Sequence, residues 1–193
     1  MRGKFFRVTD CFALFGFPRR PALDAAALKE KYLQQAACAH PDAGKGDDDK
    51  FRTVQQAYQT LRDPAARLRH LLALQFGGWK KKSLPAHQDL FLKVGEALQR
   101  AMAFQQRLEK SQTSLARALL AQDRETALSR IREVSQSVAE ARSVLERELI
   151  ALDARWPEVR PEELGNLAAG LTFLTRWQSE LSETGFRLEH AGG

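Results

Sequence analysis

The chain has 193 residues, of which 44% are hydrophobic and 28% are charged, as is typical of soluble globular proteins. No run approaches the roughly 18 apolar residues that a membrane-spanning helix needs. The basic N-terminus is not followed by the apolar segment of a secretory signal peptide. Two cysteines, Cys11 and Cys38, do not make a disulfide framework. We therefore expect a cytoplasmic protein without a membrane partner.

The net charge of +6 is concentrated in the N-terminal part of the chain. Residues 1–78 contain 13 Lys and Arg against 8 Asp and Glu, whereas residues 79–193 contain 17 against 16. A basic region favours an acidic partner surface or a nucleic acid. The charge distribution alone is equally compatible with a basic surface that contacts only solvent.

The sequence carries helical signals along its length and no convincing strand alternation. Thr9 or Asp10 can cap a short first helix, which ends at Gly16. Asp24 caps a second helix. This helix ends shortly before Pro41, because a residue that precedes proline is pushed away from helical dihedral angles.

A third helix follows an acidic, glycine-containing loop. It carries a stripe of core-facing residues at helical spacing: Phe51, Val54, Ala57, Tyr58 and Leu61. Pro64 suits the first turn of a shorter fourth helix. Residues 76–86, "FGGWKKKSLPA", break the helical pattern and indicate a linker between two domains.

Three long helices are expected in residues 87–193, joined by short loops around residues 121–124 and 155–162. Their apolar residues fall at alternating spacings of three and four: Phe91, Val94, Leu98, Ala101, Leu108, Leu115 and Leu119 in the first; Ala127, Ile131, Val134, Val138, Ala141, Leu145 and Leu152 in the second; Leu164, Leu167, Leu171, Leu174, Leu181 and Leu188 in the third. Such seams are buried best in an antiparallel, coiled-coil-like bundle. The predicted fold is all-α.

The loop between the second and third helices opens with His40-Pro41-Asp42. With its helical flanks and the downstream segment "QQAYQTLRDPAARL", this tripeptide resembles the J-domain of the DnaJ co-chaperones, over about residues 9–75. "FALFGFP" before the second helix and the separate helical bundle make the chain similar to the HscB (Jac-type) subfamily, which serves iron–sulfur cluster assembly. The resemblance implies a J-domain in residues 1–75, a linker in 76–86 and an HscB-like oligomerisation or client-binding bundle in 87–193.

The resemblance implies a co-chaperone without enzymatic activity. In the family, the tripeptide binds the ATPase domain of a DnaK- or HscA-type heat-shock 70 chaperone and promotes ATP hydrolysis, which shifts the conformation of the partner. Pro41 would fix a backbone dihedral, so the loop has less entropy to lose on binding. Asp42 would accept charge-assisted hydrogen bonds from an arginine of the partner, and His40 offers a ring and a donor nitrogen.

The family also uses a basic face on the second helix to bind the chaperone. Lys29 and Lys31 are present here, and Lys45 in the loop is a further candidate, but no Lys or Arg lies between Lys31 and His40. Ala43 stands where the family usually has lysine. Each exposed ion pair contributes at most about 1 kcal/mol and is screened by salt. We therefore expect weaker, or more partner-restricted, chaperone binding than for a typical J-domain.

The client-binding surface of the family lies on the first bundle helix, where Phe91 and Leu92 match its opening Phe-Leu pair. Phe91 also lies on the apolar seam, so core packing is its default role, and Leu92 is the better candidate contact. Four later positions depart from the apolar and acidic pattern of the family: Lys93, Glu96, Ala97 and Arg100. Binding of an iron–sulfur scaffold as the client therefore stays an open alternative.

No metal or cofactor is expected, because Cys38 and His40 make at most half of a zinc site. The rival interpretation is a divergent J-domain-like structural or nucleic-acid-associated helical protein without ATPase-stimulating activity. The isoelectric point near 9.6 favours this rival, although nucleic acid is the less expected partner. Some eukaryotic members of the subfamily carry an N-terminal cysteine-rich segment that is missing here, which favours a bacterial protein. A monomer and a weak dimer are both compatible with the sequence.

Overall fold

The structure is a computed structural model, which describes residues 9–39, 47–79 and 88–191. All regular secondary structure in these residues is α-helical, which confirms the predicted fold class. None of the described helices is both long and apolar enough to cross a membrane.

The first two helices, α1 (Cys11–Leu14) and α2 (Ala25–Ala39), begin at the predicted aspartate caps. The side chains of Asp10 and Asp24 accept hydrogen bonds from amides of the first turn, at 3.0 Å and 2.8 Å for the shorter bond of each. These bonds satisfy N–H groups that have no partner within the helix.

The next two helices are α3 (Asp48–Arg62) and α4 (Pro64–Phe76). The Asp63 side chain caps α4 and accepts a 2.8 Å bond from the amide of Ala65, and Pro64 occupies the first turn as predicted. A left-handed Gly77 ends α4, with φ of 70°, a conformation that costs glycine little.

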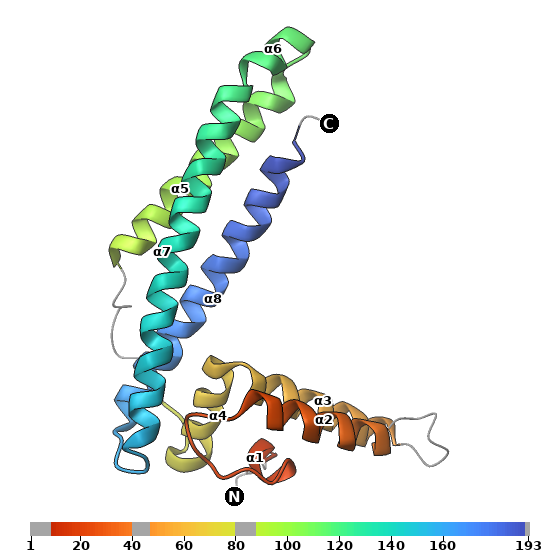
Figure 1. Cartoon of the computed structure of the whole chain (residues 1–193), viewed down its shortest axis with the longest axis vertical. Coiled ribbons are helices and arrows are strands. Elements are labelled where there is room, and N and C mark those ends of the chain that lie inside the picture. The colour runs from red at the N-terminus through yellow and green to blue at the C-terminus, as the bar shows by residue number, and fades with distance from the viewer. Residues whose placement is uncertain (1–8, 40–46, 80–87, 192–193) are drawn as a thin grey trace, which may run out of the picture. The chain divides into compact units, whose positions relative to one another are not determined.

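Helices α2 and α3 form an antiparallel hairpin, against which α1 and α4 pack (Figure 1). Their shared core consists of buried residues: Cys11, Phe12, Phe15, Leu28, Val54, Ala57, Leu61 and Leu71. Across the hairpin, the rings of Tyr32 and Tyr58 stack with centroids 4.1 Å apart. The predicted apolar stripe of α3 therefore faces the core.

The C-terminal half contains α5 (Gln88–Lys110), α6 (Ser114–Leu119), α7 (Ala121–Ala154) and α8 (Pro161–Glu189). Nearly all predicted seam residues of α7 and α8 are buried: Ala127, Ile131, Val134, Val138, Leu145, Leu152, Leu164, Leu167, Leu171, Leu174, Leu181 and Leu188. The loop predicted around residues 155–162 is confirmed, since α7 ends at Ala154 and α8 begins at Pro161.

The predicted extent of the first bundle helix is wrong. Helix α5 ends at Lys110, and the short helix α6 presents Leu115 and Leu119 to solvent, 70% and 73% exposed. The break arises because the Thr113 side chain accepts a 3.1 Å hydrogen bond from the amide of Ala116 and so caps a new helix. Residues 121–124, predicted as a loop, belong to the first turn of α7.

Contacts along the chain group it into two compact units. One contains Met1–Lys82 together with Arg147–Ala169, and the other contains Ser83–Glu146 together with Gly170–Gly193. The connection between α7 and α8 thus belongs to the unit of the hairpin. The domain limits 1–75, 76–86 and 87–193 stay predictions.

Candidate functional site

The predicted chaperone-binding loop connects the C-terminal end of α2 with the N-terminal end of α3 (Figure 1). His40, Pro41, Asp42 and Lys45 themselves lie outside the described residues. The residue before them, Ala39, is buried at 1% exposure, so α2 is packed to its last residue. The structure thus places the attachment points of the loop at one end of a packed hairpin.

Aspartates determine where α3 begins after the loop. The Asp47 side chain accepts hydrogen bonds from the amides of Asp49 and Lys50, at 2.9 Å and 3.2 Å. Asp48 and Asp49 lie in the first turn, where negative charge complements the positive end of the helix dipole. The predicted acidic start of this helix is confirmed.

The two cations of α2 have different surroundings. Lys29 is exposed, whereas the ammonium of Lys31 donates a 2.8 Å hydrogen bond to the carbonyl of Phe15 and lies 4.6 Å from the centroid of the Phe17 ring. Lys31 therefore fastens the end of α1 to α2, a role that the sequence did not reveal. Its predicted contact with a chaperone stays a prediction, and Lys29 is the better placed of the two.

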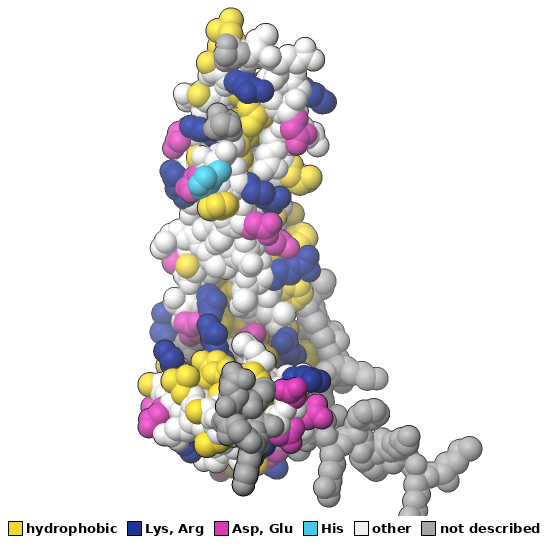
Figure 2. Space-filling view, turned by 90° about the vertical axis from the view of Figure 1, so that its right-hand side faces the viewer, with side chains coloured by type: hydrophobic (Ala, Val, Ile, Leu, Met, Phe, Trp, Pro, Cys, Tyr) yellow, Lys and Arg dark blue, Asp and Glu magenta, His cyan; other side chains and the backbone are white. Residues whose placement is uncertain are grey.

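Positive charge is sparse among the described residues at the end of the hairpin. Around the end that faces the viewer in Figure 2, hydrophobic and acidic side chains are more prominent than those of Lys and Arg. Arg52 lies 3.6 Å from Asp49, and both side chains are largely exposed, so this ion pair contributes little to stability. The thin basic face of α2 stays a prediction.

Arg67, in the segment that resembles the J-domain motif, is buried at 6% exposure. Its guanidinium donates hydrogen bonds to the carbonyls of Pro21 (Nε, 2.8 Å) and Leu61 (Nη1, 2.7 Å). Burial lowers the pKa of Arg67, and the charges of Asp63 and Asp153 oppose that shift. A guanidinium remains charged under these conditions. Arg67 thus joins three segments of the J-domain through its donors.

His70 of α4 has a structural role that sequence reasoning missed. Its Nε2 accepts a 3.1 Å hydrogen bond from the amide of Cys11, and its ring stacks on Phe12 with centroids 5.8 Å apart. The acceptor role requires an unprotonated Nε2, hence a neutral imidazole. Burial lowers the pKa of His70, the charge of Asp10 opposes this shift and the charge of Arg19 adds to it, which agrees with the neutral form.

Because of His70, we expect the free energy of unfolding of the hairpin unit to decrease as the pH is lowered. A histidine whose pKa is lowered by folding contributes fully above its unfolded value of about 6.5, and the contribution is lost as pH falls toward the folded pKa. Urea unfolding at pH 7.5 and 5.5 should show a loss of about 1 kcal/mol, the scale of one hydrogen bond. His70→Gln keeps an acceptor and should flatten this pH dependence. The exposed control His190→Gln should not, and an equal flattening by both would contradict the assignment.

The candidate client-binding residues on α5 are both exposed, Phe91 to 59% and Leu92 to 62%. The default core role of Phe91 is therefore wrong. Phe91 lies in the first turn of α5, and its ring lies beside that of Trp177, with centroids 6.1 Å apart. Ala97, one of the positions that depart from the family pattern, is fully buried, so it packs in the core and cannot contact a partner.

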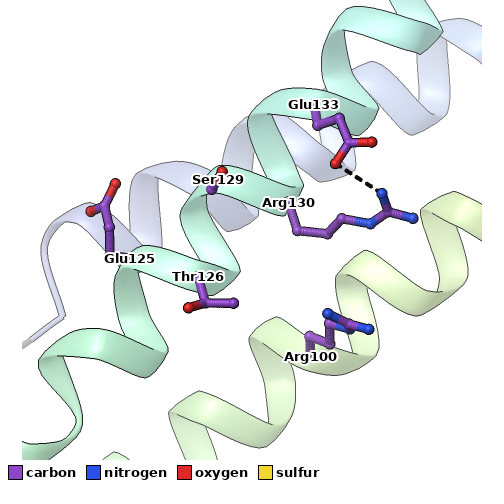
Figure 3. Close-up of a pocket in the computed structure, with 6 residues that line it drawn as sticks. All are labelled: Arg100, Glu125, Thr126, Ser129, Arg130 and Glu133. Atoms are coloured by element: carbon purple, nitrogen blue, oxygen red, sulfur yellow. Dashed lines mark ion pairs between the residues drawn. The ribbon is translucent and has the colours of Figure 1, made fainter.

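An open polar groove of about 640 Å³ lies between α5 and α7. Figure 3 shows Arg100 and Arg130 directed into it from the two helices. Arg130 forms ion pairs with Glu133 at 2.9 Å and with Glu96 at 3.7 Å. Since acids accompany its arginines, the groove has no strong preference for an anion. Among the described residues, no group of three or more His, Cys, Asp or Glu could hold a metal ion.

Comparison with known proteins identifies the family. Residues 10–70 match the DnaJ domain model. A co-chaperone HscB homologue of Chromobacterium violaceum is 45% identical over 73 residues, which are 34% of this chain and 42% of that protein. An HscB homologue of Cupriavidus taiwanensis is 31% identical over 188 residues, 93% of this chain and 96% of that protein. The chain belongs to the HscB co-chaperone family. The resemblance that the sequence indicated is confirmed.

A solved HscB chaperone from Vibrio cholerae shows the same fold, with a TM-score of 0.61 at 18% sequence identity. That match covers 93% of this chain and 99% of the Vibrio cholerae chain. The DnaJ domain of this HscB-family chain covers α1 to α3 and the first half of α4, so the tripeptide, Lys29 and the buried contacts of Arg67 and His70 all belong to it.

Proposed function

We propose that this chain is a non-enzymatic co-chaperone that binds a DnaK- or HscA-type heat-shock 70 chaperone and stimulates its ATPase. The observation that carries the proposal is the DnaJ domain, whose packed α2–α3 hairpin holds His40, Pro41 and Asp42 in its connecting loop. Because the helices that flank the tripeptide are already packed, they need no further ordering when the chaperone binds. The chain itself supplies no reacting group; it favours one conformation of the chaperone by binding that conformation better.

The weak positive charge of the hairpin supports restricted chaperone binding. Lys29 is the exposed cation of α2, whereas Lys31 is engaged within the domain. Hydrogen bonds to the tripeptide would then contribute more of the affinity than ion pairs along α2. Such binding depends less on salt than binding through a broad basic face.

The test measures ATP hydrolysis by the DnaK- and HscA-type chaperones of the host, with and without the full chain. Stimulation of one chaperone but not the other supports restricted binding, and strong stimulation of all of them contradicts it. If no chaperone responds and the chain binds DNA or RNA with an affinity that falls steeply as salt rises, the nucleic-acid-associated alternative is favoured.

The exposed pair Phe91 and Leu92 supports a client-binding role for the bundle. We propose that this role is carried out in the bacterial cytoplasm. An iron–sulfur scaffold is the client that family membership favours, and the exposed positions Lys93, Glu96 and Arg100 would modify its binding.

We expect Leu92→Ala to weaken binding of the host cluster scaffold about 5- to 30-fold, because a buried leucine contact contributes about 1–2 kcal/mol at an interface. Calorimetric titration of the full chain with the scaffold measures the effect. Met102→Ala is the matched control, since Met102 lies on the same helix and is 57% exposed. Equal affinities for the Leu92 variant and the wild type would exclude Leu92 from the client surface.

A further inference from the structure

The connection between α1 and α2 is held from two sides. On one side, the buried guanidinium of Arg67 binds the carbonyl of Pro21. On the other side lies Asp153, near the C-terminal end of α7. Its Oδ1 accepts hydrogen bonds from Arg20 Nε and from the amide of Ala22, both at 2.9 Å, and its Oδ2 pairs with Arg20 Nη2. All these residues belong to one compact unit.

This ion pair differs from an ordinary surface pair in geometry and exposure. The Arg20 guanidinium binds both carboxylate oxygens, an arrangement that adds strength and specificity. The Asp153 side chain is only 11% exposed. Burial works to raise the pKa of Asp153, but the hydrogen bonds from Arg20 and Ala22 and the charges of Arg20 and Arg67 outweigh it and hold the pKa low. The carboxylate is therefore ionised at neutral pH.

Apolar contacts accompany the ion pair. Trp156, three residues after Asp153, packs against the core cluster of the J-domain. The indole of Trp79, which follows α4, lies directly on Gly165 of α8, and a Cβ at that glycine would overlap the ring. The end of α7 and the connection after it thus meet the J-domain through Asp153 and Trp156, and the start of α8 meets the linker residue Trp79 through Gly165.

We propose that Asp153 is a positioning residue, which holds the J-domain on the C-terminal end of α7 through the connection between α1 and α2. Side-chain contacts, and not only the chain between α4 and α5, would then set where the chaperone-binding hairpin stands relative to that helix end. The functional consequence rests on the proposed function. A loosened contact would leave activation of the chaperone by the J-domain alone intact, and it would reduce any further stimulation that a client bound to the bundle adds.

The test is a distance measurement on the full chain. Spin labels are attached at Gln55→Cys and Glu158→Cys, two exposed positions in the same unit, with Cys38 replaced by serine. A narrow distance distribution is expected for the unaltered contact and a broader one for Asp153→Ala. Arg20→Gln breaks the same ion pair by changing its more exposed partner. This variant replaces Asp153→Ala in the measurement if Asp153→Ala folds poorly.

The matched control is Arg19→Gln. Arg19 is the neighbouring arginine, equally charged and similarly exposed, but it pairs with Asp10 of the J-domain at 2.7 Å. Its variant should keep the narrow distribution. An unchanged distribution in both the Asp153 and Arg20 variants, or an equal broadening in the Arg19 variant, overturns the proposal.

A functional readout separates this proposal from the proposed co-chaperone activity. In chaperone ATPase assays, the Asp153 variant should keep the stimulation seen without client and lose at least half of the extra stimulation by the scaffold. An Asp153 variant that keeps the full extra stimulation contradicts the positioning role. If the wild type stimulates no chaperone, the proposed function fails, while the distance measurement still decides whether Asp153 positions the J-domain.

Discussion

Replacing Asp42 by asparagine should abolish stimulation of the chaperone ATPase. The substitution keeps the size of the side chain and removes its charge, so a charge-assisted hydrogen bond to an arginine of the chaperone becomes a neutral one. Hydrogen bonds to charged groups contribute about 1.5–3 kcal/mol, and stimulation at subsaturating concentrations should fall at least about tenfold. Single-turnover ATP hydrolysis over a range of concentrations of the chain measures the loss.

Asp48→Asn is the matched control for this experiment, because it removes the same charge from the exposed first turn of α3, close to the same loop. It should change helix stability by about 1 kcal/mol at most and leave stimulation nearly intact. Helicity should be that of the wild type in both variants, and the melting temperature should stay within about 4 °C of the wild-type value. Normal stimulation by the Asp42 variant would show that the loop does not act as proposed.

The second large effect is expected for Arg67→Ala, which should destabilise the chain by about 3 kcal/mol or more. The variant leaves the buried carbonyls of Pro21 and Leu61 without their donors, and an unsatisfied buried polar group costs about 1–3 kcal/mol. It also leaves a cavity where the guanidinium stem packed. Urea unfolding followed by circular dichroism measures the change.

Arg67→Lys should recover only part of this loss, since one ammonium cannot reproduce the two directions in which the guanidinium donates. The control is Arg62→Ala, an exposed arginine at the end of α3, which should stay within about 0.5 kcal/mol of the wild type. Similar destabilisation by the Arg62 and Arg67 variants would mean that the buried hydrogen bonds do not stabilise the J-domain.

Much of the fold could be predicted because the signals are local. Asp10, Asp24 and Pro64 act on amides or dihedral angles within one turn, and the structure confirms each helix start that they predict. The buried leucines of α8 recur at regular spacing, so their shared face could be predicted before the neighbouring helices were known.

The predictions from sequence were wrong where two local signals conflict, or where the exposure of a residue depends on a neighbouring helix. A continuous apolar seam suggested one helix through Leu119, but the cap at Thr113 interrupts it, because capping depends on one side chain and not on periodicity. Phe91 fits the seam, yet it lies in the first turn of α5 and is 59% exposed beside Trp177. Periodicity predicts which face of a helix a residue occupies and not whether another helix covers that residue.

By itself, the sequence determined the helical fold class, the helix starts and the family resemblance. These properties depend on spacing and on interactions within a few residues. Only the tertiary structure decided that Lys31 and Arg67 bind carbonyls of other segments, that His70 accepts a hydrogen bond from the amide of Cys11, and that Asp153 forms an ion pair with Arg20. Each of these contacts joins residues that are distant in the chain, and a hydrogen bond depends on distance and direction in space.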